Sequence, residues 1–465
     1  MQFNEAQIQA IQHNTGPCMV IAGPGSGKTT VLTHRVRYLI ERYGVNPSDI
    51  LVITFTKAAA EQMKLKFKGL SEGRNSAVTF GTFHAVFFTI LKAAYNYSAH
   101  CIIKPQIQHE FVKDQMCRLE LEYDDENEAV AGVLSEISCV KGEDVNIDEY
   151  ESRCIPPQSF RIMYRAYDDM LVRKHLIDFD DMIVQCRELL MQREDYRRAW
   201  QNKYKYILID EFQDINKAQF DVVRILADEY RNLFVVGDDD QSIYKFRGAN
   251  IGNILGFEHV FPDAKVIRLE QNYRSTKNIL NAANAVIANN TSRKSKTLWT
   301  ENSEGERIHF RQFMNGYEEA EYVVGEISRA HRENGAKYKD CAVLYRTNAQ
   351  SRLFEEKCLL ANIPYKIVGG VNFYARKEIK DLLCYLKTID NSRDDLAVRR
   401  IINVPKRGIG ATTLGRIQDY ADKMSVSFYD ALRVAEEVPS IGRSLSKIDG
   451  FVTFIQSLKS KAESY

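Results

Sequence analysis

The sequence predicts an α/β fold in which P-loop parallel sheets carry inserted helical domains. Short apolar runs that indicate buried strands lie at residues 18–22, 206–209 and 233–236, and each leads into a polar or glycine-rich segment. Between the first run and the other two, residues 87–196 show helical patterning alone. A chain of 465 residues is long enough for about two to four domains with sizeable cores.

The first apolar run leads into a phosphate-binding loop. Residues 23–30 are GPGSGKTT, and a helical pattern follows from Val31. Small residues let backbone N–H groups surround phosphate oxygens at a helix N-terminus. Lys28 is expected to reach the β- and γ-phosphates of ATP, and the Thr29 hydroxyl to bind Mg²⁺. The predicted nucleotide-binding residues here are Ala22 (where the first glycine is usual), Gly23, Pro24, Gly25, Ser26, Gly27, Lys28, Thr29 and Thr30.

The second apolar run ends at two adjacent carboxylates, Asp210 and Glu211. Asp210 is suited to hold Mg²⁺ through water, and Glu211 to orient and deprotonate an attacking water. An Asp-Glu pair on its own usually lies on a solvated loop. Here a buried strand delivers the pair to the sheet edge where α/β proteins bind ligands, which favours a second half of an ATP site.

The third apolar run is followed by groups suited to both phosphate and nucleic acid. Residues 238–247 are DDDQSIYKFR. Gln241 can contact a phosphate, while Tyr244, Phe246 and Arg247 can hold a base or a backbone phosphate. One short segment could therefore couple the state of a nucleotide to the grip on a strand, which favours a motor over a simple hydrolase.

These motifs and several others resemble, in order, those of the UvrD/Rep/PcrA group of superfamily 1A DNA helicases. The resemblance runs from the N-terminus to about residue 415. Besides Ala22, two positions depart from the family pattern, Lys57 for Asn and Phe246 for Trp, and the second reduces stacking area. Besides the segments above, the matching motifs are residues 3–7 (FNEAQ), 53–60 (ITFTKAAA), 81–84 (GTFH), 178–181 (DFDD), 210–214 (DEFQD), 271–275 (QNYRS) and 342–352 (AVLYRTNAQSR).

The resemblance implies roles around ATP. Gln7 would bond the adenine edge, and Tyr273 and Arg35 would stack on its faces. For Arg35, simple solvation on its helix is an equally good interpretation. Gln241 would contact the γ-phosphate, and Arg274 would act as an arginine finger that offsets charge during phosphoryl transfer. The predicted catalytic residues are Lys28, Asp210, Glu211, Gln241 and Arg274.

The resemblance also implies a surface for single-stranded DNA, held by aromatic stacking and phosphate contacts. Aromatic residues at strand ends usually belong to the core, and for Phe83 core packing is as good an interpretation. A Gly-x-Gly turn farther along would contact duplex DNA, although a plain helix–helix turn explains it equally well. The predicted DNA-binding residues are Phe55, His84, Phe179, Tyr244, Phe246, Arg247, Arg346 and Asn348, and, for the duplex, Lys406, Arg407, Gly408 and Gly410.

The domain organisation implied by the motifs is a RecA-like ATP-binding domain at 1–86 and 197–280, interrupted by a helical domain at 87–196. Residues 281–380 would form the first part of a second RecA-like domain, with strands near 308–310, 341–345 and 365–368. Residues 381–465 would be a partial helical insertion. Because motifs V and VI of the family are absent, we expect a truncated helicase that binds ATP yet hydrolyses it poorly.

Composition bounds these expectations. Lys and Arg number 63 against 62 Asp and Glu, so a net charge of +1 gives no global sign of nucleic-acid binding. The nine Cys show no zinc-binding spacing and are expected to be reduced thiols of a cytoplasmic protein. No apolar run approaches the ~20 residues of a membrane span.

The expected function is that of an ATP-dependent DNA helicase or translocase that moves 3′ to 5′ and couples ATP hydrolysis to strand separation. Its partners would be single-stranded DNA and single-strand/duplex junctions, with repair or replication proteins, and it would be a monomer or weak oligomer. Two alternatives stay open. One is the motor part of a helicase–nuclease or repair complex, and the other an ATP-switched DNA-binding module with little turnover.

Overall fold

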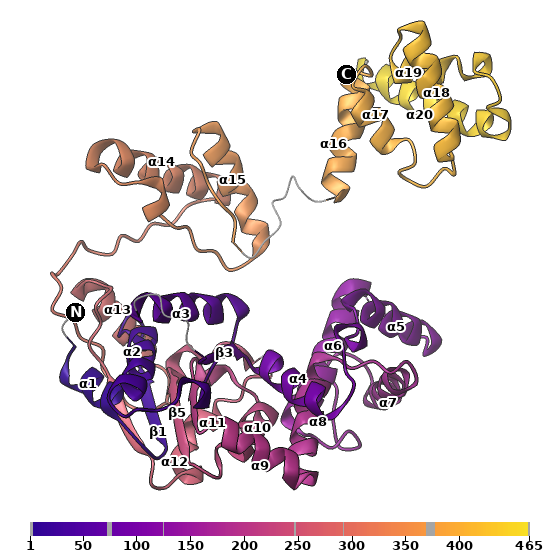
Figure 1. Ribbon diagram of the computed structural model, residues 1–465. Helices are drawn as coiled ribbons and strands as arrows, with labels where there is room; N and C mark the ends of the chain where they lie inside the picture. Colours follow the sequence, from indigo (N-terminus) through magenta and orange to yellow (C-terminus); the bar gives the residue numbers. More distant parts are fainter. Residues whose placement is uncertain are drawn as a thin grey trace. The chain divides into compact units, whose positions relative to one another are not determined.

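The computed structural model divides into two units, Met1–Ile308 and His309–Tyr465 (Figure 1). It describes residues 3–71, 77–123, 125–245, 248–291, 293–368 and 377–463, without the side chains of residues 443 and 463. Among the described residues, no helix is both long and apolar enough to cross a bilayer.

The first unit is built on a six-stranded parallel sheet with the strand order β3-β2-β4-β5-β1-β6. Every residue of β1 and β2 is buried, as expected for a parallel sheet covered on both faces. All carboxyl ends of the strands meet at one edge, where ligands bind in such folds. The strands are β1 (Cys18–Ala22), β2 (Ile50–Thr54), β3 (Thr79–Thr82), β4 (Tyr206–Ile209), β5 (Asn232–Gly237) and β6 (Lys265–Leu269).

Two hydrophobic cores lie on the two faces of this sheet. Met19 and Ile21 of β1 belong to one core, and Val20 and Ala22 to the other, because successive strand residues point to opposite faces. The first core is completed by α4, α8, α10, α11 and α12, and the second by α1, α2 and α3. These helices and α13 are α1 (Glu5–Gln12), α2 (Lys28–Glu41), α3 (Lys57–Leu70), α4 (Phe83–Ala94), α10 (Lys217–Ala227), α11 (Gly252–Leu255), α12 (Phe257–Val260) and α13 (Lys277–Ile287).

Between β3 and β4 the described chain consists of helices and their connecting turns, with one isolated bridge, Ile102 to Ile177. Residues of α5, α6 and α7 form a core of their own, whereas α8 packs on α4 and α10 of the sheet layer. The insertion is thus anchored through α8. Its helices are α5 (Pro105–Arg118), α6 (Glu126–Glu143), α7 (Pro157–Arg173), α8 (Phe179–Gln192) and α9 (Glu194–Lys203).

The second unit contains helices in both of its described stretches. In residues 309–368, α14 (Gly316–Asn334) and α15 (Ser351–Leu360) share a small core around Val324, Cys358 and Ile363. Residues 377–463 form a separate helical core. Its helices are α16 (Lys377–Asp390), α17 (Asp395–Ile401), α18 (Ala411–Met424), α19 (Phe428–Arg433) and α20 (Leu445–Glu463).

The strands expected near 308–310, 341–345 and 365–368 are not formed, and that prediction was wrong. Their apolar side chains are exposed instead: Phe310 is 89% exposed and Leu344 94%. An extended apolar segment becomes a strand only when a neighbouring segment pairs with its N–H and C=O groups. The sequence pattern records the apolar side chains but not whether that pairing partner is present.

Candidate functional site

The phosphate-binding loop connects the buried end of β1 to the first turn of α2. Gly25 and Gly27 have φ of 68° and 87°, the left-handed region that favours glycine. Gly27 caps α2 without a side-chain hydrogen bond, so no cap side chain occupies the first N–H groups of the helix. The Ser26 hydroxyl donates to the Gly23 carbonyl at 2.7 Å and closes the loop. The loop has the form of an anion-binding site.

Lys28 and Glu211, predicted from separate motifs, meet at this loop. The Lys28 Nζ lies 3.3 Å from the Glu211 Oε2, and the Lys28 side chain is 12% exposed. The two residues follow β1 and β4, which end at the same sheet edge. Glu211 has a φ of 54°, a conformation that costs energy for a residue other than glycine. The strained turn directs its carboxylate back toward the loop.

Asp210 and Thr29 are the neighbours of this pair in sequence, and both offer oxygen ligands. Asp210 is 6% exposed, and its N–H donates to the Ile53 carbonyl at 2.9 Å. Burial, and then the nearby Glu211, raises the pKa of Asp210 to about 6. One oxygen of the buried Asp214 carboxylate has no hydrogen-bond partner. Carboxylate and hydroxyl oxygens are the protein ligands that Mg²⁺ prefers, so these residues fit that ion.

A chain of hydrogen bonds leads from Glu211 to Gln241. The Gln213 Nε2 donates to the Glu211 Oε2 at 2.9 Å, and the Gln213 Oε1 accepts from the Asp238 N–H at 2.9 Å. The Gln241 Nε2 donates to the Asp238 Oδ2 at 2.6 Å. Sequence reasoning did not single out Gln213 or Asp238. The only signal for either was its place inside a motif.

Gln7 and Tyr273 lie together at the other side of the loop. The Gln7 Nε2 donates to the Ser26 carbonyl at 3.0 Å, and the Tyr273 hydroxyl donates to the Gln7 Oε1 at 3.5 Å. Tyr273 is 46% exposed, and its backbone N–H donates to the Gly25 carbonyl at 3.0 Å. The next residue, Arg274, is exposed and lies beside Gly25, where an added Cβ would be 2.8 Å from the Arg274 Cβ. The predicted adenine and finger residues thus border the phosphate loop.

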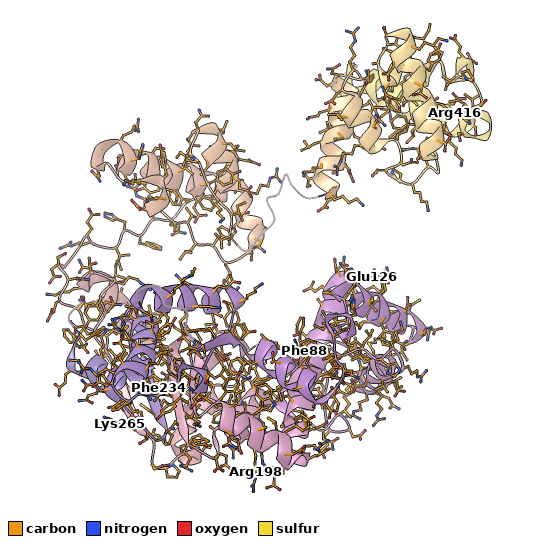
Figure 2. The ribbon with its side chains drawn as sticks, in the orientation of Figure 1. Phe88, Glu126, Arg198, Phe234, Lys265 and Arg416 are labelled. Atoms are coloured by element: carbon orange, nitrogen blue, oxygen red, sulfur yellow. The ribbon has the colours of Figure 1, made fainter. Side chains whose placement is uncertain are left out.

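Arg35 has a different environment from the one predicted. It is 1% exposed, its guanidinium lies 4.3 Å from the centre of the Phe234 ring, and it donates to the His13 and Asn14 carbonyls. Phe234 is itself in the interior of the first unit (Figure 2). Burial lowers the pKa of Arg35 to about 10. These contacts give Arg35 a packing role, and its stacking on adenine stays a prediction.

Four of the residues predicted to bind DNA form two aromatic pairs. Phe55 is stacked on Tyr244 with ring centres 5.7 Å apart and planes at 21°. His84 meets Phe179 edge to face at 5.3 Å and 75°. Phe179 is 53% exposed, and burial lowers the pKa of His84 below its ordinary 6.5. Phe83, by contrast, is 2% exposed and belongs to the core. Phe246 and Arg247 lie outside the described residues.

The predicted residues of the second unit fall into two groups. Arg346 and Asn348 are exposed, as is Lys406, and their roles stay predictions. Arg407 is engaged inside its own helical module. Its Nη1 donates to the carbonyls that end α17, with Ile401 and Ile402 at 3.1 Å, and its Nη2 donates to the Tyr385 hydroxyl at 2.8 Å.

The turn after Arg407 keeps the features that suggested a phosphate contact. Gly408 has a φ of 70°, and Gly410 caps α18 without a side-chain hydrogen bond. The Lys447 ammonium donates to the Gly408 carbonyl at 3.1 Å. A contact between this turn and duplex DNA is compatible with these features and stays a prediction.

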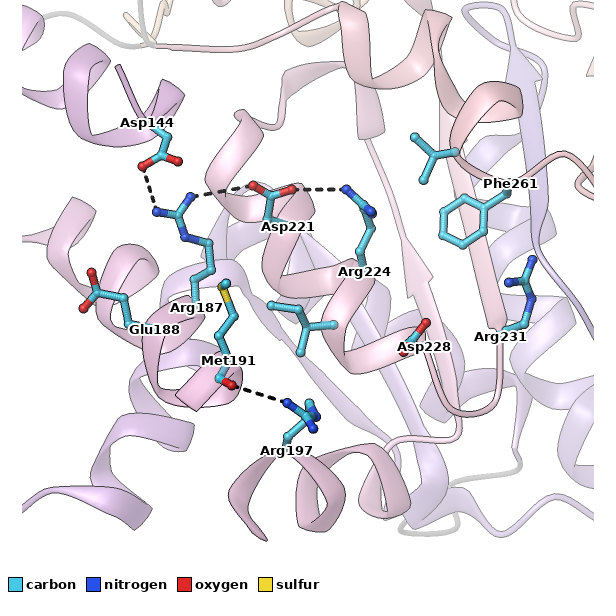
Figure 3. Close-up of a pocket in the computed structure, with 12 residues that line it drawn as sticks. Asp144, Arg187, Glu188, Met191, Arg197, Asp221, Arg224, Asp228, Arg231 and Phe261 are labelled. Carbon is cyan, nitrogen blue, oxygen red and sulfur yellow. Dashed lines mark hydrogen bonds and ion pairs between the residues drawn. The ribbon is translucent and has the colours of Figure 1, made fainter. Parts of the chain in front are cut away.

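A groove of about 700 Å³ lies away from all of these residues, between α8, α9, α10 and α12 (Figure 3). Arg187 pairs there with Asp144 at 2.8 Å and with Asp221 at 3.7 Å. The lining holds four arginines and four acidic residues. With charges balanced in this way, the groove favours neither an anionic nor a cationic ligand.

Comparisons with known proteins decide the family. The model of the UvrD/REP helicase N-terminal domain matches residues 3–262, and that of the UvrD-like helicase C-terminal domain matches residues 267–462. The chain belongs to the UvrD/Rep helicase family. It is similar to the ATP-dependent DNA helicase PcrA of Staphylococcus aureus (strain NCTC 8325 / PS 47), with 42% identity over 99% of this chain. It is also similar to the PcrA of Staphylococcus epidermidis (strain ATCC 12228 / FDA PCI 1200), with 43% identity over 98%.

This UvrD/Rep family chain spans 64% and 63% of the lengths of these two relatives. The similarity accounts for the order of motifs seen along the sequence. It confirms the resemblance to superfamily 1A helicases and the α/β fold.

Proposed function

We propose that this chain is an ATP-driven motor that moves 3′ to 5′ on single-stranded DNA and couples ATP hydrolysis to strand separation. The observation that carries the proposal is the 3.3 Å contact between Lys28 and Glu211, which brings a phosphate-binding cation and a candidate general base to one sheet edge. The relatives are named ATP-dependent DNA helicases, which supports the same activity here.

ATP would bind with its phosphates in the loop before α2 and its adenine near Gln7 and Tyr273. Mg²⁺, held by Thr29 and by Asp210 through water, would offset charge on the β- and γ-phosphates. Lys28 binds the phosphates, Glu211 orients the attacking water and takes its proton, and Arg274 offsets charge on the transferred group. Glu211 pairs with Lys28 in the structure. Entry of the γ-phosphate would therefore release Glu211 to act as the base.

Single-stranded DNA, and the junction between single strand and duplex, would be held by the aromatic pairs. The rings of Phe55 and Tyr244 stack on each other at 5.7 Å, and aromatic rings of this kind are the groups on which bases stack. Phe179 is exposed beside His84 and offers a second platform. Stacking tolerates every base, which suits a motor that must move along any sequence.

The hydrogen bonds through Gln213 and Asp238 give a physical route between these two activities. Gln241 contacts the Asp238 carboxylate, and Tyr244 lies three residues farther along the same segment. A shift of Gln241 on loss of the γ-phosphate would therefore move Tyr244 relative to Phe55. Grip on the strand would change with the state of the nucleotide.

Replacement of Lys28 by Ala tests the proposal. We expect DNA-stimulated ATP hydrolysis to fall by at least about 100-fold, because a cation that stabilises the transition state is lost. Strand displacement should be lost with it, while some binding of single-stranded DNA remains. Lys265→Ala is the matched control, since Lys265 is an exposed lysine at the opposite, N-terminal end of the strands (Figure 2).

Three further results would contradict the proposal in part or in whole. Unwinding of 5′-tailed rather than 3′-tailed duplexes would contradict the direction. If ATP altered DNA affinity in the natural chain but no turnover occurred, the chain would be an ATP-switched DNA-binding module instead. Equal hydrolysis by the natural chain and Lys28→Ala would overturn the motor itself.

A further inference from the structure

A buried lysine holds the acidic turn that precedes Gln241. Lys296 is 5% exposed, and its Nζ lies 2.8 Å from the Asp238 Oδ1, 2.6 Å from the Asp239 Oδ1 and 2.7 Å from the Asp240 Oδ2. The side chains of Asp238 and Asp239 have no exposed surface. Lys296 is the counterion that ion pairs give the buried Asp238 and Asp239 carboxylates in the described part of the chain, so its removal would leave these two charges uncompensated.

The three carboxylates could suggest a metal site, since their oxygens lie within 4.8 Å of one another. The Lys296 ammonium, however, lies between 2.6 and 2.8 Å from each residue and occupies the place of a cation. Burial opposes its charge, but the hydrogen bonds to the three carboxylates outweigh burial and raise the pKa of Lys296. The Lys296 ammonium therefore stays charged at neutral pH and is paired within the cluster.

The residues just before Lys296 contact the same turn. The Arg293 Nη2 lies 2.6 Å from the Asp240 Oδ2, and the Lys294 N–H donates to the Asp239 Oδ2 at 2.6 Å. Two neighbouring polar atoms, the Arg293 Nε and the Asp240 Oδ1, are buried without a hydrogen-bond partner. The contact between residues 293–296 and the acidic turn therefore involves backbone as well as side chains.

The residues just after Lys296 contact the segment that carries Tyr273 and Arg274. The Asn272 N–H donates to the Trp299 carbonyl at 2.7 Å, and the Thr300 hydroxyl donates to the Asn272 carbonyl at 2.7 Å. The Asn272 side chain in turn donates to the Pro24 carbonyl at 2.6 Å and accepts from the Arg274 N–H at 2.8 Å. This end of the segment is therefore one residue from the phosphate loop and from the predicted arginine finger.

Leu298 brings the same segment into direct contact with the phosphate loop. A Cβ added to Gly23 would lie 2.2 Å from the Leu298 Cδ2. Real Cβ atoms do not approach so closely, so a larger residue at position 23 would force the Leu298 side chain to shift. Residues 293–300, which we call the strap, thus touch three parts of the nucleotide site.

We propose that the strap transmits movement between the acidic turn and the phosphate loop, and that Lys296 is the positioning residue that places Gln241 through Asp238. The inference rests on the proposed ATPase and names a device that would regulate it. Lys296 does not touch Gln241, but both bond to the Asp238 carboxylate, Lys296 to Oδ1 and Gln241 to Oδ2. A shift of the ammonium would therefore be passed to the Gln241 amide.

The first test is a double-mutant cycle on the full chain. Lys296→Arg keeps the charge, and with it the fold, but a planar guanidinium cannot place one nitrogen between three carboxylates. We expect kcat for ATP hydrolysis to fall by about tenfold, with KM changed by less than about threefold, because positioning and not ground-state binding is lost. Gln241→Ala should lower kcat at least as much. If Lys296 acts through Gln241, the double variant should lie within about twofold of Gln241→Ala.

Lys294→Ala is the matched control. The Lys294 side chain contacts Glu258, and Lys294 reaches the acidic turn through its backbone N–H. Its kcat should equal that of the natural chain. If the reductions in kcat caused by Lys296→Arg and Gln241→Ala multiply in the double variant, the two residues act independently. Lys296 would then have a structural role only, and the proposal fails.

The second test does not need turnover. The sequence has two tryptophans, Trp299 in the strap and Trp200 in the core, and they are 48% and 8% exposed. In a Trp200→Phe background, a non-hydrolysable ATP analogue with Mg²⁺ should shift the Trp299 emission. Lys296→Arg should reduce that shift by at least about half, since the strap would no longer follow the acidic turn.

The outcomes separate the two proposals. A Trp299 shift that depends on Lys296, without ATP turnover in the natural chain, would support the strap and contradict the motor. Turnover with no such dependence would support the motor and contradict the strap. Absence of a Trp299 response together with absence of ATP turnover would contradict both.

Discussion

Two buried lysines in the first unit hold three carboxylates each, yet they connect different parts of the fold. The Lys141 Nζ on α6 lies 3.0 Å from Asp168 on α7, and 3.0 and 2.7 Å from Asp178 and Asp181 at the start of α8. Lys296 contacts three consecutive residues of one turn. A buried lysine paired with three carboxylates therefore holds three helices together around Lys141. Around Lys296 the same arrangement stabilises the conformation of a single turn.

The position of α8 gives Lys141 an indirect link to the predicted DNA surface. Asp178 caps α8, with its Oδ1 accepting the Asp181 N–H at 2.7 Å, and the first residue of the helix is Phe179. Phe179 meets His84 at the sheet edge. Loss of Lys141 should thus loosen the insertion and a DNA platform together, whereas a change at Lys296 should act on turnover. Stability and activity would be separable at the two sites.

The largest expected effect is that of Lys141→Met, which removes the charge and retains the hydrophobic length. Three carboxylates would lose their common counterion, and removal of one partner from a buried pair costs about 3–5 kcal/mol. Hydrogen–deuterium exchange should show that the free energy of local opening in α7 and α8 is lower by this amount, while the amides of β1 and β5 are less affected.

The conservative variant Lys296→Arg separates the two lysines further. It should leave hydrogen–deuterium exchange in α7 and α8 unchanged while ATP turnover falls. Equal exchange in the natural chain and Lys141→Met would show that the ion cluster does not anchor the insertion. A loss of protection throughout the sheet would show that it supports more than these helices.

The next effect concerns pH, through Asp180 in the first turn of α8. Burial, and then the charge of Asp178, raises the pKa of Asp180 to about 7, while Ser138 and Lys141 oppose the shift. The ordinary pKa is 3.8. A carboxyl whose pKa is raised on folding contributes stability that is complete below its unfolded pKa and is lost as pH rises toward 7.

Asp180→Asn should remove that loss, because the amide is neutral at every pH. The difference in free energy of unfolding between the variant and the natural chain should favour the variant more at pH 8 than at pH 5. We expect this difference to change by about 1–3 kcal/mol between the two pH values. Urea unfolding at both pH values measures it. A margin independent of pH would show that Asp180 is ionised normally in the folded chain.

The local parts of the candidate nucleotide site could be predicted from the sequence, because they depend on residues that are neighbours along the chain. The glycines before Lys28 and the strand before Asp210 specify their own geometry, and parallel strands bring their ends to one edge. The meeting of Lys28 with Glu211, which are 183 positions apart, followed from that rule.

The cations were harder to place, since their partners are remote in sequence. Lys296 and Asp239 are 57 positions apart, and a lysine in a polar stretch is usually exposed. For Arg35 and Arg407 a ligand contact and a purely structural role were equally good interpretations, and both residues bond to backbone carbonyls inside the fold. The strands expected in the second unit failed for a related reason, because pairing is a property of two segments and periodicity describes only one.

The smallest expected effect separates the members of the Lys141 cluster. The Asp168 side chain is 40% exposed, whereas the Asp178 side chain is 5% exposed. Water can therefore solvate the Asp168 carboxylate when its ion pair is lost. We expect Asp168→Asn to cost about 1 kcal/mol, near the upper value for an exposed pair. Asp169→Asn is the matched control, because Asp169 pairs with Arg173 at 3.6 Å on the solvent side of the same helix. It should change stability by less than about 0.5 kcal/mol.

Urea unfolding of the two asparagine variants at pH 7 makes the comparison. A cost for Asp168→Asn as large as that of Lys141→Met would mean that the cluster acts as one unit that fails when any member is lost. A cost equal to that of Asp169→Asn would place the anchoring in Asp178 and Asp181 alone, at the cap of α8. In that case Lys141 would resemble Lys296 after all, since both would hold a single turn at the start of a functional segment.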